Sequence, residues 1–173
     1  MAIPVIETER LILRGIGPED AEACIAFMIS SRAEYIGRKK DRREAWRTVA
    51  TLIGHWTLRG YGPWAVADRG DNRILGVIGP WCPEGWPEAE MSWSVFAEAE
   101  GRGIAREAAL AARDHAYREL GWKTAVSYID PENARSIRLA QTLGAVLDPD
   151  APHPDFDGDA CVVYRHPAPE EVR

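Results

Sequence analysis

The sequence contains few cysteines and histidines and no long run of apolar residues. Its three cysteines, Cys24, Cys82 and Cys161, are scattered and form no Cys-x-x-Cys pair, so neither a disulfide framework nor a zinc site is indicated. The four histidines also lack the spacing of metal ligands. No segment approaches the roughly 18 consecutive apolar residues that cross a membrane, and residues 1–10 lack the basic and apolar regions of a signal peptide. We therefore expect a cytoplasmic protein that holds no metal ion.

Positive charge is also in short supply, since 21 lysines and arginines stand against 27 acidic residues. The net charge of −6 argues against nucleic acid as a partner, because such proteins need a basic surface. It weakly favours a cationic ligand such as an amine. A length of 173 residues with 46% apolar side chains is typical of one domain with its own core. We expect residues 1–173 to form this single domain, as a monomer or a homodimer.

Hydrophobic periodicity and turn residues divide the chain into alternating strands and helices. Strands are predicted at residues 8–14, 64–67, 74–79, 90–95, 124–129 and 160–165, and helices at residues 18–31, 44–59, 105–120 and 133–143. The helix at 105–120 carries alanines at steps of three and four, which would let it approach a sheet closely. This order predicts a mixed sheet flanked by helices, in an α/β or α+β arrangement.

Residues 90–108, EMSWSVFAEAEGRGIAREA, join a predicted strand to a predicted helix through a glycine-rich turn. The first turn of a helix leaves backbone amides unpaired and partly positive, and glycines let an anion approach them. The turn therefore predicts a pyrophosphate site, to which Arg102 and Arg106 can add charge, although it also fits an ordinary helix start. A dinucleotide fingerprint would need glycine in place of Arg106, and no Walker loop occurs. The basic residues 38–43 are either a solvated loop or a second phosphate contact.

Several segments together resemble the GNAT superfamily of acetyltransferases. Residues 100–105, Glu-Gly-Arg-Gly-Ile-Ala, are similar to its acetyl-CoA loop, Gln/Arg-x-x-Gly-x-Gly/Ala, which opens a long helix. The opening ETERLILR, followed by Pro-Glu-Asp at residues 18–20, is similar to the start of the ribosomal-protein N-acetyltransferase branch. Residues 133–136 and 143–145 resemble that branch's Asn-x-x-Ser and Leu-Gly-Phe motifs.

The chain departs from the family's pattern at three positions. Glu100 stands where Gln or Arg is usual, Ala145 replaces a common Phe, and Ala140 occupies the place of a tyrosine that serves many members as general acid. The resemblance implies the GNAT fold, an α/β (α+β) architecture whose mixed, mostly antiparallel central sheet is flanked by helices. It also implies acetyl-CoA as co-substrate.

In the family, the pantetheine arm of acetyl-CoA lies beside the fourth strand, and the pyrophosphate rests on backbone amides of the loop. In this sequence the strand corresponds to residues 90–95 and the loop to residues 101–105. The cofactor-binding residues that the resemblance implies are Trp93, Val95, Phe96, Gly101, Arg102, Gly103, Ile104, Ala105, Arg106, Asn133 and Ser136.

The resemblance further implies acetyl transfer to a primary amine by direct attack, without an enzyme nucleophile. Glu90 is the candidate base, acting through a water, with Glu88 as its competitor. The alternative for Glu90 is a solvent-facing carboxylate at a strand end. Ser136 is the candidate proton donor to the departing thiolate, and Tyr164 is the second candidate. The alternative for Ser136 is an ordinary residue in the first turn of a helix that Asn133 caps. The candidates to wall the acceptor pocket are Trp81, Trp86 and Trp93.

Two functions stay open at this stage. The first is an N-acetyltransferase whose acceptor is a protein N-terminus or a small amine, such as an amino acid, polyamine or aminoglycoside. The second is a non-catalytic acyl-CoA-binding or regulatory module. The missing tyrosine acid and the unusual Glu100 leave the second open, because binding needs the loop alone whereas catalysis also needs a base and an oriented acceptor.

Overall fold

The computed structural model describes residues 2–156, 158 and 160–172. Its strands are β1 (Ile6–Glu7), β2 (Leu11–Arg14), β3 (Trp64–Asp68), β4 (Ile74–Trp81), β5 (Glu90–Val95), β6 (Val126–Ile129), β7 (Val146–Leu147) and β8 (Val162–Arg165). Its α-helices are α1 (Ala21–Ile29), α2 (Arg42–Arg59), α3 (Ile104–Arg118) and α4 (Ala134–Thr142), and short 3₁₀ helices cover residues 18–20, 31–36, 97–99 and 169–171. Each predicted helix and strand is present, with ends shifted by a few residues. The first predicted strand, residues 8–14, begins only at Leu11 as β2, because residues 8–10 form the turn that follows β1. Neither β1 nor β7 has a predicted counterpart.

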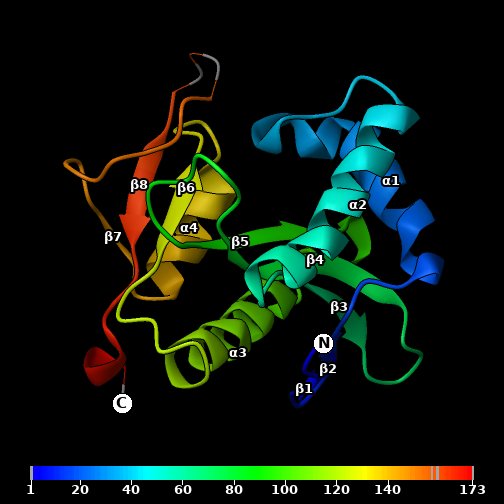
Figure 1. Ribbon diagram of the computed structural model, residues 1–173, viewed down its shortest axis with the longest axis horizontal. Coiled ribbons are helices and arrows are strands. Elements are labelled where there is room, and N and C mark those ends of the chain that lie inside the picture. The colour runs from blue at the N-terminus through cyan, green and yellow to red at the C-terminus, as the bar shows by residue number, and fades with distance from the viewer. Residues whose placement is uncertain (1, 157, 159, 173) are drawn as a thin grey trace.

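Over the described residues the strands form one sheet in the order β1-β2-β3-β4-β5-β6-β8-β7 (Figure 1). Neighbouring strands are antiparallel except β5 and β6, which are parallel. This confirms the mixed, mostly antiparallel sheet expected from the sequence. The parallel pair is joined through α3, since two parallel neighbours need a crossover connection.

The side chains of β4 are divided between two separate cores, and the register shift in its pairing with β3 interrupts the strict alternation near Leu75. On one face, Leu75 and Ile78 pack with α3, whose buried alanines are Ala108, Ala109, Ala112 and Ala116. On the other face, Ile74 and Val77 pack with side chains of α1 and α2. Because successive side chains of a strand point to opposite faces, the sheet is covered on both sides. Figure 1 shows the same separation of α3 from α1 and α2.

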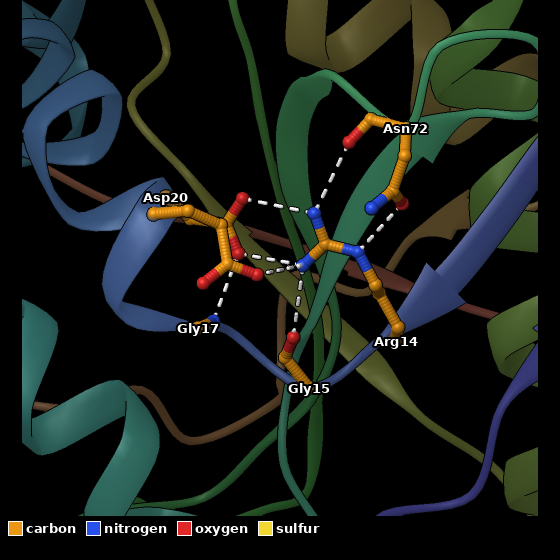
Figure 2. A network of polar contacts seen from close by, with 6 residues as sticks. Arg14, Gly15, Gly17, Asp20 and Asn72 are labelled. Atoms are coloured by element: carbon orange, nitrogen blue, oxygen red, sulfur yellow. Dashed lines mark hydrogen bonds and ion pairs between the residues drawn. The ribbon is translucent and has the colours of Figure 1, made fainter.

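A buried ion pair anchors α1 to the sheet (Figure 2). Arg14 ends β2, and its Nη1 and Nη2 donate to Oδ2 and Oδ1 of Asp20 at 2.6 and 3.0 Å. Asp20 is only 2% exposed, and its Oδ2 also accepts from the Gly17 amide at 2.8 Å. Arg14 Nε donates to Asn72 Oδ1 in the β3–β4 turn at 2.9 Å. These bonds fix where α1 begins, and α1 forms one wall of the cavity described below.

Replacing Asp20 with alanine should lower the free energy of unfolding by about 3 kcal/mol or more, because it leaves a largely buried guanidinium without its partner. Urea denaturation measures the change. The matched control is Glu22→Ala, which removes the exposed Arg42–Glu22 pair and should leave the stability close to that of the natural chain. Equal stability of the two variants would contradict the anchoring role of Asp20.

Candidate functional site

The sheet divides between β5 and β6. Along its full length β5 pairs with β4, from Trp81 opposite Glu90 to Gly76 opposite Val95. By contrast, β6 pairs with β5 at one position, Glu90 opposite Val126. Beyond that position, the described part of the chain places no strand against the second edge of β5. An uncovered edge of this kind presents backbone donors and acceptors to a ligand.

Alternate residues of β5 present their backbone to this gap. The Phe96 amide donates to Leu75 O at 2.9 Å, on the β4 side, whereas Ala89 O accepts from the Val126 amide at 3.0 Å, on the β6 side. In an extended strand the amide and carbonyl of one residue point the same way, and the direction alternates along the chain. The β5 residues whose backbone faces the gap are therefore Met91, Trp93 and Val95.

Trp93 and Val95 thus have backbone groups placed as expected for a pantetheine contact. Phe96 does not, because its amide bonds to β4 and its carbonyl accepts from the Ala99 amide at 3.0 Å. The expectation of a backbone contact from Phe96 is therefore wrong. Its ring instead lines the cavity and packs against Phe27, with 5.1 Å between ring centroids.

A buried chain of hydrogen bonds holds β5 and β6 at the point where they separate. Ser127 Oγ donates to Met91 O at 2.7 Å, so that a hydroxyl takes the place of a backbone amide. His166 Nε2 lies 3.0 Å from Ser127 Oγ, and Arg113 Nη1 lies 3.2 Å from His166 Nδ1. Because a guanidinium can only donate, Nδ1 is the acceptor and Nε2 carries the hydrogen that is donated to Ser127.

Burial, together with the nearby Arg113 charge, lowers the pKa of His166 to about 3. The imidazole is therefore neutral over the physiological pH range, which keeps its tautomer fixed. Arg113 Nη1 also donates to Leu143 O at 2.6 Å. Sequence reasoning did not find these residues, since no spacing or motif connects three side chains from α3, β6 and the segment after β8.

The turn before α3 presents unbonded backbone amides. Gly101 and Gly103 have φ angles of 72° and 76°, in the left-handed region that glycine adopts readily. Gly103 is the N-cap of α3, and its carbonyl accepts from the Glu107 amide at 3.1 Å. No described residue accepts a hydrogen bond from the amides of residues 102–105. This is the arrangement of an anion site at a helix N-terminus.

Side chains of the N-terminal segment hold this turn in place. Arg10 Nη1 donates to Arg102 O at 2.8 Å, and Arg10 Nε donates to Glu107 Oε2 at 2.7 Å. Thr8 Oγ1 donates to Glu107 Oε1 at 2.6 Å. The opening ETERLILR segment therefore supports the loop directly, a role that sequence reasoning did not assign to it.

Glu100, which departs from the family's pattern, is paired with two arginines. Its carboxylate contacts Arg32, in the 3₁₀ helix at residues 31–36, and Arg135 of α4, the latter at 3.0 Å. These guanidinium groups balance its charge beside the loop, which lessens the electrostatic cost of an anion there. Arg102 and Arg106 add further positive charge to the same turn.

A cavity of about 540 Å³ lies at the opening between β5 and β6, walled on its other side by α1 and residues 34–39. Trp81, Trp86 and Trp93 all line it, as predicted. Asn133 and Ser136 line it from the start of α4. Among the described residues, its charged lining consists of Glu34, Lys39, Glu90, Asp130 and Asp155.

Glu90 is a buried carboxylate in this cavity rather than a solvent-facing one. It is 9% exposed, and its Oε2 accepts from Trp86 Nε1 at 2.8 Å. Burial raises its pKa from 4.5 to about 7, against the opposing effect of hydrogen bonds from Trp86 and the Tyr128 backbone. The competitor Glu88 is bound through both oxygens to Arg165, at 2.9 Å each. The carboxylate poised to exchange a proton near neutral pH is therefore Glu90.

Ser136 lies beside β5. Trp93 Nε1 donates to Ser136 Oγ at 3.2 Å, and the Ser136 amide donates to Asn133 Oδ1 at 3.1 Å, so Asn133 does cap α4. The Ser136 hydroxyl hydrogen has no acceptor among the described residues. Tyr164 is packed in a small core cluster with Ala140 and is not among the residues that line the cavity.

The described residues contain no group of three or more side chains that could hold a metal ion. None of their helices is long and apolar enough to cross a membrane. Cys24 is buried, which raises its pKa to about 12 and leaves it protonated.

Comparisons with known proteins agree with this geometry. Residues 10–146 match the family described as the acetyltransferase (GNAT) domain. The fold superposes on the acetyltransferase from Agrobacterium tumefaciens strain C58 with a TM-score of 0.88 and 35% identity, covering 96% of this chain and 95% of that one. The N-acetyltransferase YoaA of Bacillus subtilis is 26% identical over 145 residues, 82% of each chain.

The ribosomal L7/L12 α-N-protein acetyltransferase RimL, in its complex with coenzyme A, shares the fold with a TM-score of 0.73 at 18% identity. That alignment covers 94% of this chain and 97% of RimL. The uncovered edge of β5, the unbonded amides before α3 and the family match over most of the chain lead to one conclusion. The chain belongs to the GNAT acetyltransferase family and is an acyl-CoA-dependent N-acetyltransferase.

Proposed function

We propose that this protein transfers an acetyl group from acetyl-CoA to a primary amine, with Glu90 as base and Ser136 as proton donor. The observation that carries the proposal is the continuity of three features. The uncovered edge of β5 and the buried carboxylate of Glu90 meet at one cavity, and β5 leads along the chain to the unbonded amides of residues 102–105. A thioester placed along β5 would therefore lie close to a group that can deprotonate an amine.

The residues present fit coenzyme A. The backbones of Trp93 and Val95 would hold the pantetheine arm as an added strand would be held. The amides of residues 102–105, with Arg102 and Arg106, would hold the pyrophosphate, while Gly101 and Gly103 shape the turn. When bound, acetyl-CoA supplies the acetyl group as an activated thioester.

Glu90 would remove the proton that the acceptor ammonium must lose before it can attack. An alkyl ammonium ordinarily holds its proton at pH 7, so a base near neutral pKa is needed. A carboxylate with a pKa of about 7 is half ionised at pH 7, and it accepts a proton more readily than an ordinary glutamate. We place one water between Glu90 and the amine.

Ser136 would return a proton to the departing sulfur. Its oxygen accepts from Trp93 Nε1, which leaves the hydroxyl hydrogen available for a donor role. Asn133 acts indirectly, because it caps α4 and thereby fixes the first turn that carries Ser136. This assignment offers a proton donor in a chain whose Ala140 stands in the place of the family's tyrosine.

We further propose that residues 1–173 act as one domain in the cytoplasm, as a monomer or a homodimer. The direct test of the function is release of free thiol from acetyl-CoA in the presence of primary amines, with mass spectrometry of the amine product. Tight binding of coenzyme A without thiol release on any amine would favour the non-catalytic alternative instead.

Glu90→Gln should lower kcat by roughly 10²- to 10⁴-fold, since it removes the base. In the natural chain kcat should rise with pH through an inflection near 7, because Glu90 must be ionised to act. The variant should lack this inflection, whereas Glu88→Gln should retain it. An inflection near 7 that survives in Glu90→Gln would show that another group is the base.

The same titration predicts a stability change. The folded state binds the Glu90 proton more tightly than the unfolded chain does, because burial raises the pKa above 4.5. The free energy of unfolding should therefore fall as the pH rises from about 4.5 to about 7. Glu90→Gln should remove this part of the pH dependence, which urea titrations at several pH values can measure.

Gly103→Ala should weaken coenzyme A binding about tenfold or more. A side chain at φ 76° is strained by about 1–2 kcal/mol, and relief of that strain moves the neighbouring amides. The matched control is Gly121→Ala, which imposes the same strain at φ 70° just after α3, away from the loop. Calorimetry should show the loss of affinity in the first variant alone, and equal affinities would contradict the amide site.

A further inference from the structure

Three aromatic rings meet beside Glu90. Trp86 comes from the loop before β5, Tyr128 from β6 and Phe156 from the segment between β7 and β8. Their centroids lie 5.7 Å apart for Trp86–Phe156, 6.3 Å for Tyr128–Phe156 and 6.4 Å for Trp86–Tyr128, at interplanar angles of 86°, 64° and 82°. All three rings line the cavity, and we refer to them as the aromatic box.

The aromatic box has the chemistry of an ammonium site. Rings set nearly perpendicular to one another can each offer part of a negative face to a compact cation. The Trp86 indole N–H bonds to Glu90 at 2.8 Å, so the box and the proposed base are adjoining parts of one site. Among the described residues, carboxylates also outnumber cations along the cavity wall, with Asp130 and Asp155 on the side of the box.

One wall of the box carries a polar group without a partner. The Tyr128 hydroxyl is buried, and no described residue forms a hydrogen bond with it. Native structures seldom leave such a group unsatisfied. Because this oxygen is buried, it faces the protein beside the Glu88 backbone rather than the cavity, and the ring of Tyr128 is the part available to a bound molecule.

The box also joins two loops over the acceptor side of the cavity. The Trp86–Phe156 contact connects the loop before β5 to the segment before β8. A polypeptide N-terminus continues into a main chain and side chains that need an open groove between these loops. A small amine needs no such exit, and it can be enclosed together with Glu90.

From this geometry we propose that the acceptor is a small primary alkylamine, bound as its ammonium in the aromatic box of Trp86, Tyr128 and Phe156. This inference rests on the proposed function, because it names the acceptor of the same reaction. The ammonium loses one proton to Glu90, its nitrogen forms a bond to the acetyl carbon, and the bond from that carbon to sulfur breaks. Ser136 gives its proton to the departing sulfur and takes up the second proton that the nitrogen loses, so the products are the N-alkylacetamide, coenzyme A thiol and protonated Glu90.

The test measures thiol release by the full chain from acetyl-CoA with two sets of acceptors. One set contains small amines, 2-phenylethylamine and putrescine, and the other contains short peptides with a free N-terminal serine or alanine. The expected result is a kcat/KM for at least one small amine about 100-fold or more above that for every peptide. The neutral analogue 2-phenylethanol should not compete with the amine.

Variants of the box provide the second part of the test. Phe156→Leu keeps an apolar side chain but removes the ring face, and it should raise KM for the small amine about threefold to thirtyfold, with little change in KM for acetyl-CoA. The matched control, Trp46→Ala, removes an aromatic ring that is 60% exposed on α2 and should change neither constant.

The outcomes separate the two proposals. Acetylated peptides with inert small amines would overturn the small-amine acceptor while leaving the N-acetyltransferase function in place. An unchanged amine KM in Phe156→Leu would overturn the aromatic box. No thiol release with either set, although coenzyme A binds, would overturn the proposed function itself.

Discussion

The separation of β5 and β6 after a single paired position is the constraint on which the site depends. Where the two strands separate, Ser127 Oγ donates to Met91 O in the place where a neighbouring strand would present an amide. Behind the serine, Arg113 donates a hydrogen bond to His166, and the neutral His166 donates one to Ser127, so each group in the chain has a partner. The separation of β5 from β6 creates both the uncovered edge of β5 and the cavity beside it. The same strand then leads to the loop before α3, so the two halves of a coenzyme A site follow one another along the chain.

Charge is divided across this site in a way that suits the two substrates. Arg102 and Arg106 add positive charge to the loop, and Arg32 and Arg135 balance the carboxylate of Glu100. Around the acceptor side, carboxylates and aromatic rings prevail. A diphosphate at the loop and an ammonium in the cavity beside β5 would therefore meet surroundings of opposite charge. The carboxylate of Glu100, which departs from the family's pattern, is paired with arginines from two distant segments.

Much of the fold and of the loop before α3 could be predicted from short sequence patterns. The alanine spacing of α3, the glycines at 101 and 103 and the Asn133 cap each act within a few residues, so the sequence displays them directly. The features that escaped prediction depend on distant contacts. Arg10 is 97 residues from Glu107, and Arg113 is 53 from His166. The error at Phe96 has another cause, because which residues of a strand face a gap depends on register, and a one-residue shift reverses every direction.

Amide-resolved hydrogen exchange with and without coenzyme A tests the central claim most directly. It measures separately the β5 amides that face the gap and the amides that are bonded to β4. The account predicts that coenzyme A slows exchange at the amides of Trp93, Val95 and residues 102–105. It predicts no change at the Phe96 amide, which already donates to Leu75 O. Unchanged exchange at Trp93 and Val95 in the presence of bound coenzyme A would contradict a cofactor held along the open edge of β5.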